Sequence, residues 1–222
     1  EEIATQPEMP TGTLRINAPR ESVALLFGLF DAFLKRYPDM RLDITTESRL
    51  VDIVAEGYDA GIRLAESLPQ DMIAVTLTPD VRMRIVGTAE YFARCGIPHS
   101  PEDLLHHQSI GMRMSHGGLY HWELERQQQK LTVNVPPRIT LSEMGAIHRA
   151  VLAGLGLAFI SDWFIKEDLA CGRLVSVMDE WCPTFAGLRL YYPGRRHVPP
   201  GLKAFISLVH ELRDRPDPAG KI

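Results

Sequence analysis

The spacing of apolar residues at the start of the chain predicts a strand followed by a helix. Residues 13–18 (TLRINA) alternate between polar and apolar side chains, which is typical of a half-buried strand. Pro19 then opens a helix, and Pro38 ends it. Residues 23–30 are apolar almost all round, so we expect this part of the helix to be largely buried and not merely laid on a surface.

The next segments continue the alternation of strand and helix. Residues 41–45 predict a second strand, and residues 59–64 predict a third. Between them we expect a short helix with Ser48 as its N-cap, ended by Gly57 in the left-handed conformation. A strand, helix, strand, helix, strand order predicts a parallel sheet with right-handed crossovers.

The remaining two thirds of the chain predict a second α/β unit and a return to the first. Two strand-like runs, 73–77 and 83–88, have no helix between them, so we interpret them as an extended passage from one subdomain into another. Further strands are expected at 109–112, 120–125, 131–135, 138–141, 155–160 and 188–192. We expect helices that begin at Ala89, at Pro101 and at Pro200, a helix over 143–153 with Ser142 as its N-cap, and a helix from Ser161 to Gly172.

Composition and charge narrow the classes of function. The chain has 222 residues and a net charge of −4, with no basic stretch denser than Arg195, Arg196 and His197, so these residues as a whole are a poor match to a nucleic-acid-binding surface. No apolar run reaches the roughly 18 residues of a membrane span, and the N-terminal residues lack the pattern of a secretory signal. The three cysteines are widely spaced, which fits a reducing compartment, and we expect a cytoplasmic protein.

The usual signatures of catalysis, nucleotide binding and metal binding are missing from the sequence. There is no phosphate-binding loop, no His-Glu-x-x-His and no Cys-x-x-Cys, and we expect neither an enzyme nor a bound cofactor or metal. His106 and His107 would point to opposite faces of a strand, so we favour loop or solvated histidines over a metal site. For Cys182 we favour a thiol packed in the core or a loop over a reactive thiol. For Arg195 to His197 we favour a solvated turn over an anion-binding site.

The positive signal is the polar character of the strand-to-helix junctions. In open sheets, ligands bind where the carboxyl ends of parallel strands meet helix N-termini, whose free N–H groups favour carboxylates and polar groups. Such junctions follow the first, second and later strands, at 18–22, 45–48, 141–143 and 160–162. Each serine there could simply cap its own helix, but the set as a whole favours a ligand-binding cleft.

Several segments, in their order and spacing, resemble the effector-binding domain of LysR-type transcriptional regulators. The resemblance covers about residues 12–213 in register. The segments are GTLRINAP (12–19), FLKRYPDMRLDI (33–44), VDIVAEGYDAGIRL (51–64), GLGLAFIS (154–161), GRLV (172–175) and YYPGRRHVPPGLKAFI (191–206).

The resemblance implies a fold like the type 2 periplasmic binding proteins, with two Rossmann-like α/β subdomains joined by two crossover segments. Residues 13–78 and 187–213 would form subdomain I, and residues 79–186 subdomain II. Residues 1–12 would be a linker remnant and 214–222 a flexible tail. The winged helix-turn-helix with which the family begins has no counterpart here, so we expect DNA to be read by a missing N-terminal domain.

The resemblance also implies a ligand site between the two subdomains. Family members place ligand contacts at the start of the first helix, after the second strand, on the third strand and at helix starts of the second subdomain. The corresponding residues here are Pro19, Arg20, Glu21, Ser22, Thr46, Glu47, Ser48, Arg63, Ser142 and Glu143, to which we add the helix-start residue Ser161. For Arg63, a pairing with Glu66 or another acidic neighbour stands as an equal alternative.

The sequence therefore predicts a non-enzymatic, cytoplasmic sensor domain of a LysR-type regulator. It would bind a small-molecule effector, with a small carboxylate or a polar aromatic compound favoured, and control transcription through rearrangement of a homodimer or homotetramer. A transport-type solute-binding protein of the same fold is the alternative. The expected absence of a signal peptide and the spacing of the cysteines argue against it.

Overall fold

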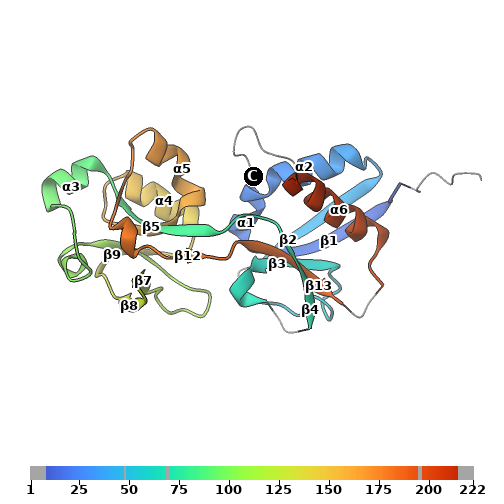
Figure 1. The fold of residues 1–222 in the computed structure, drawn as a ribbon, viewed down its shortest axis with the longest axis horizontal. Coiled ribbons are helices and arrows are strands. Elements are labelled where there is room, and N and C mark those ends of the chain that lie inside the picture. Colours follow the sequence, from blue (N-terminus) through green and yellow to red (C-terminus); the bar gives the residue numbers. More distant parts are fainter. Residues whose placement is uncertain (1–8, 48, 69–70, 195–196, 215–222) are drawn as a thin grey trace, which may run out of the picture. The chain divides into compact units, whose positions relative to one another are not determined.

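The computed structural model describes residues 9–47, 49–68, 71–194 and 197–214, which form two compact units. Unit 1 consists of the chain up to Pro79 and from Ala186 on, and unit 2 is Asp80–Phe185. Figure 1 shows both as layers of helices and strands.

Unit 1 is built on a five-stranded mixed sheet. Its strand order is β2-β1-β3-β13-β4, in which β1 is parallel to β2 and to β3, and β13 is antiparallel to both β3 and β4. The parallel arrangement predicted for the first three strands is correct, and β13 is the strand that departs from it. The five strands are β1 (Gly12–Ala18), β2 (Met40–Thr46), β3 (Ala60–Leu64), β4 (Met72–Thr76) and β13 (Leu188–Pro193).

The predicted first helix is two helices, α1 (Arg20–Leu25) and α2 (Phe27–Arg36). Leu26 interrupts them with φ −95° and ψ 5°, and its carbonyl accepts hydrogen bonds from the amides of Leu29 and Phe30. The expectation that residues 23–30 are largely buried is wrong, because one side of the two helices faces solvent and Phe27 is 67% exposed. The sequence pattern gave no hint of the break, since neither glycine nor proline stands at residue 26.

Helices α2 and α6 (Pro200–Asp214) lie side by side against unit 1's sheet (Figure 1). Their contact is aromatic: the rings of Phe33 and Phe205 meet edge to face with 5.2 Å between centroids, and Phe30 stacks on Phe205 at 6.3 Å. The amphipathic pattern predicted for the last helix is thus the pattern of its buried face.

The segment after β2 contains one capped turn where a short helix was expected. The predicted cap, Ser48, lies outside the described residues. The Asp52 carboxylate accepts hydrogen bonds from the amides of Val54 and Ala55 and so caps the turn. Gly57, at φ +75°, ends it in the left-handed conformation as predicted. An aspartate two or three residues before free amides is an equally good cap, which explains why the turn starts later than expected.

Unit 2 is centred on β5, which pairs antiparallel with β10, β11 and β12. A parallel pair, β6 and β9, joins this sheet through a bridge between Ser109 and Leu157. β7 and β8 form a hairpin whose two-residue turn, Gln127 and Gln128, has positive φ at both positions. The strands are β5 (Val81–Gly87), β6 (Ser109–Met112), β7 (Trp122–Arg126), β8 (Gln129–Val133), β9 (Pro137–Leu141), β10 (Ala158–Ser161), β11 (Val175–Val177) and β12 (Thr184–Phe185).

Helices and hairpin cover different sides of unit 2's central strands. In Figure 1, α4 and α5 lie above β5 and the β7–β8 hairpin lies below it. The ring of Trp122 from the hairpin stacks on Phe159 of β10 at 5.5 Å, so the hairpin contributes to the core. The helices are α3 (Ala89–Cys95), α4 (Met144–Leu152) and α5 (Asp162–Ala170).

Candidate functional site

The predicted unit 1 residues come together at one edge of its sheet. β1, β2 and β3 are parallel, so their carboxyl ends share that edge. Ala18 and Thr46 are register partners at the ends of β1 and β2, Pro19 follows directly, and Arg63 lies near the end of β3. This edge, formed by Pro19 to Ser22, Thr46, Glu47 and Arg63, is called the carboxyl edge of unit 1 below.

The start of α1 is already partly occupied by its own hydrogen bonds. Pro19 is the N-cap residue, and its carbonyl accepts hydrogen bonds from both the amide of Ser22, at 3.1 Å, and the Ser22 hydroxyl, at 2.7 Å. Ser22 is buried, Glu21 is half-buried and Arg20 is exposed. Since its proton is used, the Ser22 hydroxyl can offer a ligand only a lone pair and not the donated bond that its position at a helix start suggests.

The end of β2 presents one free hydroxyl and one paired carboxylate. Thr46 is exposed. The Glu47 amide donates to the carbonyl of Ala18, which ties the two strand ends together, and the Glu47 carboxylate lies 3.0 Å from the Arg49 guanidinium. Glu47 is therefore neutralised locally and opposes an anionic ligand less than an unpaired carboxylate would.

Arg63 is the most unusual residue of this edge, since it is a buried cation held by neutral groups. Its guanidinium donates to the side-chain oxygen of Asn17 at 2.6 Å and to the carbonyls of Ile62 and Arg49 at 2.6 and 2.7 Å. Burial lowers its pKa, which Tyr191 and Glu47 partly offset. None of its bonds within the described residues goes to a carboxylate, so the pairing with Glu66 left open by the sequence is absent there.

The predicted residues of unit 2 also share an edge. β9 and β10 both run parallel to β6, so Ser142 and Glu143 after β9 and Ser161 at the end of β10 stand at the carboxyl ends of parallel strands. Ser161 caps α5 as predicted, its hydroxyl accepting from the Trp163 amide at 3.3 Å. Ser142 does not cap α4: the N-cap position belongs to Glu143, without a side-chain cap bond, and both residues are exposed.

Sequence reasoning missed two charged clusters in unit 2. In one, Arg84 lies 2.9 Å from the Asp179 carboxylate, to which Ser176 also donates, while Arg82 donates to the Asp179 carbonyl. In the other, the buried Asp168 carboxylate contacts His148 and Arg173, each at 2.6 Å. The available signal was weak: an aspartate at an otherwise inward-facing helix position, and two arginines at alternate positions of a strand.

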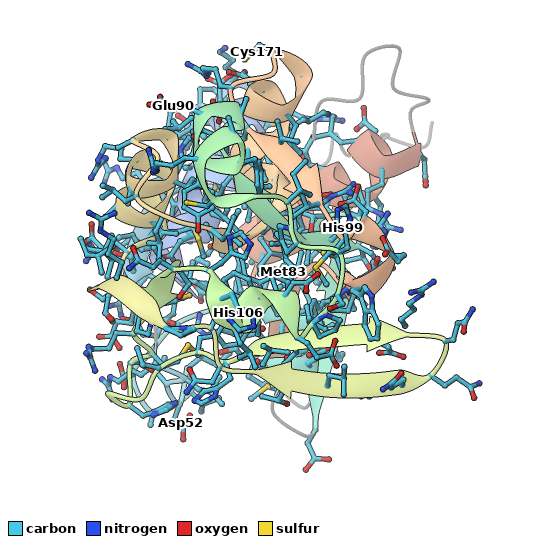
Figure 2. The ribbon with its side chains drawn as sticks, turned by 90° about the vertical axis from the view of Figure 1, so that its left-hand side faces the viewer. Asp52, Met83, Glu90, His99, His106 and Cys171 are labelled. Atoms are coloured by element: carbon cyan, nitrogen blue, oxygen red, sulfur yellow. The ribbon has the colours of Figure 1, made fainter. Side chains whose placement is uncertain are left out.

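The adjacent histidines are split between surface and core. His106 is exposed at the end of a 3-10 helix, Asp103–His106, and carries a label in Figure 2. His107 is buried, with Nδ1 3.1 Å from the Tyr91 hydroxyl, which itself accepts from the Gln108 amide. The preference for loop or solvated histidines fits both residues, since His106 is solvated and His107, although buried, lies in the loop before β6. Within the described ranges, no three His, Cys, Asp or Glu residues gather as metal ligands.

We expect His107 to make unit 2 less stable in mild acid. Burial lowers the His107 pKa, so the unfolded chain takes up a proton at a higher pH than the folded chain does. This part of the stability is fully present above the unfolded pKa of about 6.5 and is lost as the pH falls below it. Chemical denaturation between about pH 8 and pH 5 should therefore show a shallower pH dependence in His107→Gln than in the wild type. His106→Gln, its exposed neighbour, should keep the wild-type slope, and equal slopes in all three proteins would contradict the prediction.

Comparison with known proteins places this geometry in a family. A family model described as the LysR substrate binding domain matches residues 7–214. This chain belongs to the LysR substrate-binding domain family. The resemblance found in the sequence is confirmed, and so is the predicted α/β fold of the type 2 periplasmic-binding-protein kind.

The relatives of this LysR substrate-binding domain are transcriptional regulators. The HTH-type transcriptional regulator YcaN of Escherichia coli is 40% identical over 201 residues, which cover 90% of this chain and 66% of YcaN. PgrR of the same species is 33% identical over 200 residues, covering 89% of this chain and 67% of PgrR. The LysR domain thus spans about two thirds of the length of these relatives.

Solved structures agree with the family. The regulatory domain of CrgA, a LysR-type transcriptional regulator from Neisseria meningitidis, is 28% identical, with 91% of this chain and all of that domain covered and a TM-score of 0.77. The regulatory domain of AphB from Vibrio vulnificus is 25% identical, covers 90% of this chain and 98% of that domain, and gives a TM-score of 0.73. No helix in the described part of this LysR domain is long and apolar enough to cross a bilayer.

Proposed function

We propose that this domain is the effector sensor of a cytoplasmic, DNA-binding transcriptional regulator of the LysR type, and that the effector is a small molecule. Effector binding would shift the equilibrium between differently assembled homodimers or homotetramers and so change transcription. DNA contacts would belong to a part of the protein outside the matched region, and the domain itself would catalyse no reaction. Such a sensor works only if the effector binds one state more tightly than the other.

The observation that carries this proposal is the carboxyl edge of unit 1. It combines an exposed hydroxyl at Thr46, a helix start at Pro19 and the buried cation Arg63 within neighbouring strand ends. Because the Glu47 carboxylate pairs with Arg49, Arg63 sets the sign of the local charge, which favours a small carboxylate or a polar aromatic compound. The exposed Ser142 and Glu143 and the capping Ser161 would supply the contacts of unit 2.

A ligand screen tests the proposal. Thermal unfolding with a panel of small carboxylates, such as benzoate and its hydroxylated derivatives, should reveal compounds that stabilise the domain. At about 100 times its Kd a ligand adds roughly 2.7 kcal/mol, or on the order of 5 to 10 °C for a domain of this size. If the domain also catalysed the conversion of a compound that it binds, the proposal that it catalyses no reaction would be overturned.

With a hit in hand, Arg63→Gln should weaken binding by about 1.5 to 3 kcal/mol, or roughly 10- to 150-fold, because a charged hydrogen-bond donor is lost. Calorimetry is the direct measurement, and Arg41→Gln, an exposed arginine on β2, is the control that should bind normally. Thr46→Val, at an exposed position, provides a second variant if Arg63→Gln does not fold. Normal binding by both Arg63→Gln and Thr46→Val would place the site elsewhere.

Self-association should depend on the exposed apolar side of α1 and α2. Phe27 is 67% exposed and Leu34 40% exposed, and the two lie seven residues apart on α2, a spacing that places them on one face of the helix. We expect Phe27→Glu to weaken association at least tenfold in sedimentation velocity at about 100 μM, because burying an unpaired carboxylate in an interface costs more than about 1.4 kcal/mol. Ile97→Glu, which also replaces an exposed apolar residue, should associate like the wild type. A strictly monomeric wild-type domain would count against the proposed assembly.

A further inference from the structure

Three buried polar side chains from neighbouring strands of unit 1 lie on one face of its sheet. Asn17 of β1 and Tyr191 of β13 are both register partners of Gly61 on β3, and Arg63 stands two residues further along β3. Side chains in register, or two residues apart on one strand, share a face. Asn17 and Tyr191 are 0% exposed and Arg63 is 4% exposed. These three residues are called the donor cluster below.

Gly61 makes room for this arrangement. A Cβ atom at position 61 would lie 2.3 Å from Cζ of Tyr191 and 2.5 Å from its hydroxyl oxygen. The phenol therefore leans over Gly61, toward the strand that carries Arg63 and away from its own. Its hydroxyl lies above the register position next to Asn17. Burial raises the pKa of Tyr191, and the charge of Arg63 partly offsets that rise.

Hydrogen-bond accounting shows that the donor cluster has unused donors. Arg63 uses its two terminal nitrogens on the Asn17 side-chain oxygen and on backbone carbonyls, but its Nε–H has no hydrogen-bond partner among the described residues. Within the part of the chain that the structure describes, the Asn17 amide nitrogen and the Tyr191 hydroxyl also have no partner. An unsatisfied buried polar group costs roughly 1 to 3 kcal/mol. Three of them in one cluster call for a group that accepts hydrogen bonds.

The charge of the cluster points the same way. The groups that bind Arg63 are neutral, and the Glu47 carboxylate, which acts on it electrostatically, makes its own pair with Arg49. A buried cation without a paired anion is costly. A water molecule would satisfy some donors, but it brings two further protons that need acceptors and no charge. An anion satisfies the donors and the charge together.

The cover over this face is a short irregular segment. The Arg49 carbonyl accepts from Arg63, and Val51 and Ile53 pack against Tyr191. The segment ends in a single turn capped by Asp52. Short segments of this kind can open locally without global unfolding.

We infer that unit 1 contains a buried anion site formed by Asn17, Arg63 and Tyr191, which takes a halide ion or the carboxylate group of a small molecule. Both are compact anions that accept hydrogen bonds and donate none. The carboxylate form deepens the proposed function and rests on it, because Arg63 is also a proposed effector contact. The halide form stands without it.

Thermal unfolding of the chain in two titrations tests the site. One titration uses sodium formate and the other sodium bromide, each balanced to constant ionic strength with sodium isethionate, whose anion is larger than formate or bromide. We expect a saturable rise in Tm of about 3 to 6 °C at ten times the Kd. Response to bromide alone identifies a free ion as the occupant, and a response to formate that a screened effector abolishes identifies an effector carboxylate. No saturable response to either salt overturns the site and leaves water as the occupant.

Matched variants assign the response to the donor cluster. Tyr191→Phe removes one donor and keeps the ring, so the anion affinity should fall about tenfold, whereas Tyr192→Phe on the same strand should titrate like the wild type. Asn17→Asp places a carboxylate against the Arg63 guanidinium, so it should abolish the anion response while keeping Tm at or above the anion-free wild-type value. Identical titrations in wild type, Tyr191→Phe and Asn17→Asp would overturn the inference.

The same variants separate this inference from the proposed function. Suppose that an effector stabilises the wild type and Tyr191→Phe equally, and that neither salt changes the Tm of the wild type. This result would support the sensor function and exclude the anion site. A salt response that Tyr191→Phe weakens, in a chain that binds no compound of the screen, would establish the anion site and count against the effector.

Discussion

Replacing Gly187 with alanine is expected to lower the free energy of unfolding by about 3 kcal/mol, or roughly 6 to 12 °C in Tm. A Cβ atom there would lie 2.0 Å from the carbonyl oxygen of Pro79 and 2.5 Å from the Thr78 hydroxyl. These are backbone and short side-chain atoms that cannot swing aside. They also belong to the pairing in which the Thr78 hydroxyl accepts from the Leu188 amide at 2.9 Å.

The control is Gly28→Ala, because nothing lies within 4 Å of the added methyl group in the first turn of α2. That substitution should stabilise the protein by about 0.5 to 1 kcal/mol through helix propensity. Thermal and urea unfolding of the two variants compare a glycine needed for close approach with one that is not. A Gly187→Ala protein as stable as the wild type would contradict the close approach of Gly187 to Thr78 and Pro79.

Phe205→Ala should cost about 3 to 5 kcal/mol, because it opens a cavity at the centre of unit 1. The Phe205 ring is 0% exposed and contacts both Phe33 and Phe30. Losing it removes the contact that holds α6 against α2. Phe205→Leu, which fills part of the space, should recover most of the loss.

Phe27→Ala removes the same number of atoms from an exposed position and serves as the matched control. Its effect on the unfolding of dilute protein should stay within about 0.5 kcal/mol. Urea denaturation at low micromolar concentration keeps self-association out of the comparison. A loss below about 1 kcal/mol in Phe205→Ala would show that α6 contributes little to the core of unit 1.

Several features of the fold could be predicted from the sequence because their signals are local. The alternation of residues 13–18, the proline before α1, the amphipathic pattern of α6 and the serine cap at Ser161 each depend on residues within a few positions of one another. The order of such segments was also enough to identify the family. The break at Leu26 and the cap at Asp52 escaped prediction, because a continuous helix and an earlier cap satisfy the same local rules.

The composition of the candidate site was predicted only in part. The strand order of the first segments placed Pro19 and Thr46 at one edge, and the family resemblance added Arg63; in the structure all three lie at that edge. What Arg63 contacts could not be predicted. Its partner Asn17 is 46 residues away, and Tyr191 is brought next to Gly61 only by the antiparallel pairing of β13.

The sequence by itself therefore determined most of the strands and helices, their order and the family of this protein. The tertiary structure alone decided which polar groups are buried together, where Gly61 and Gly187 must remain glycine, and which donors are left without partners. The physical reason is that periodicity and capping depend on neighbours along the chain. Burial, register and hydrogen-bond satisfaction depend on which distant strands pair, and the alternation of side chains is the same for either direction of pairing.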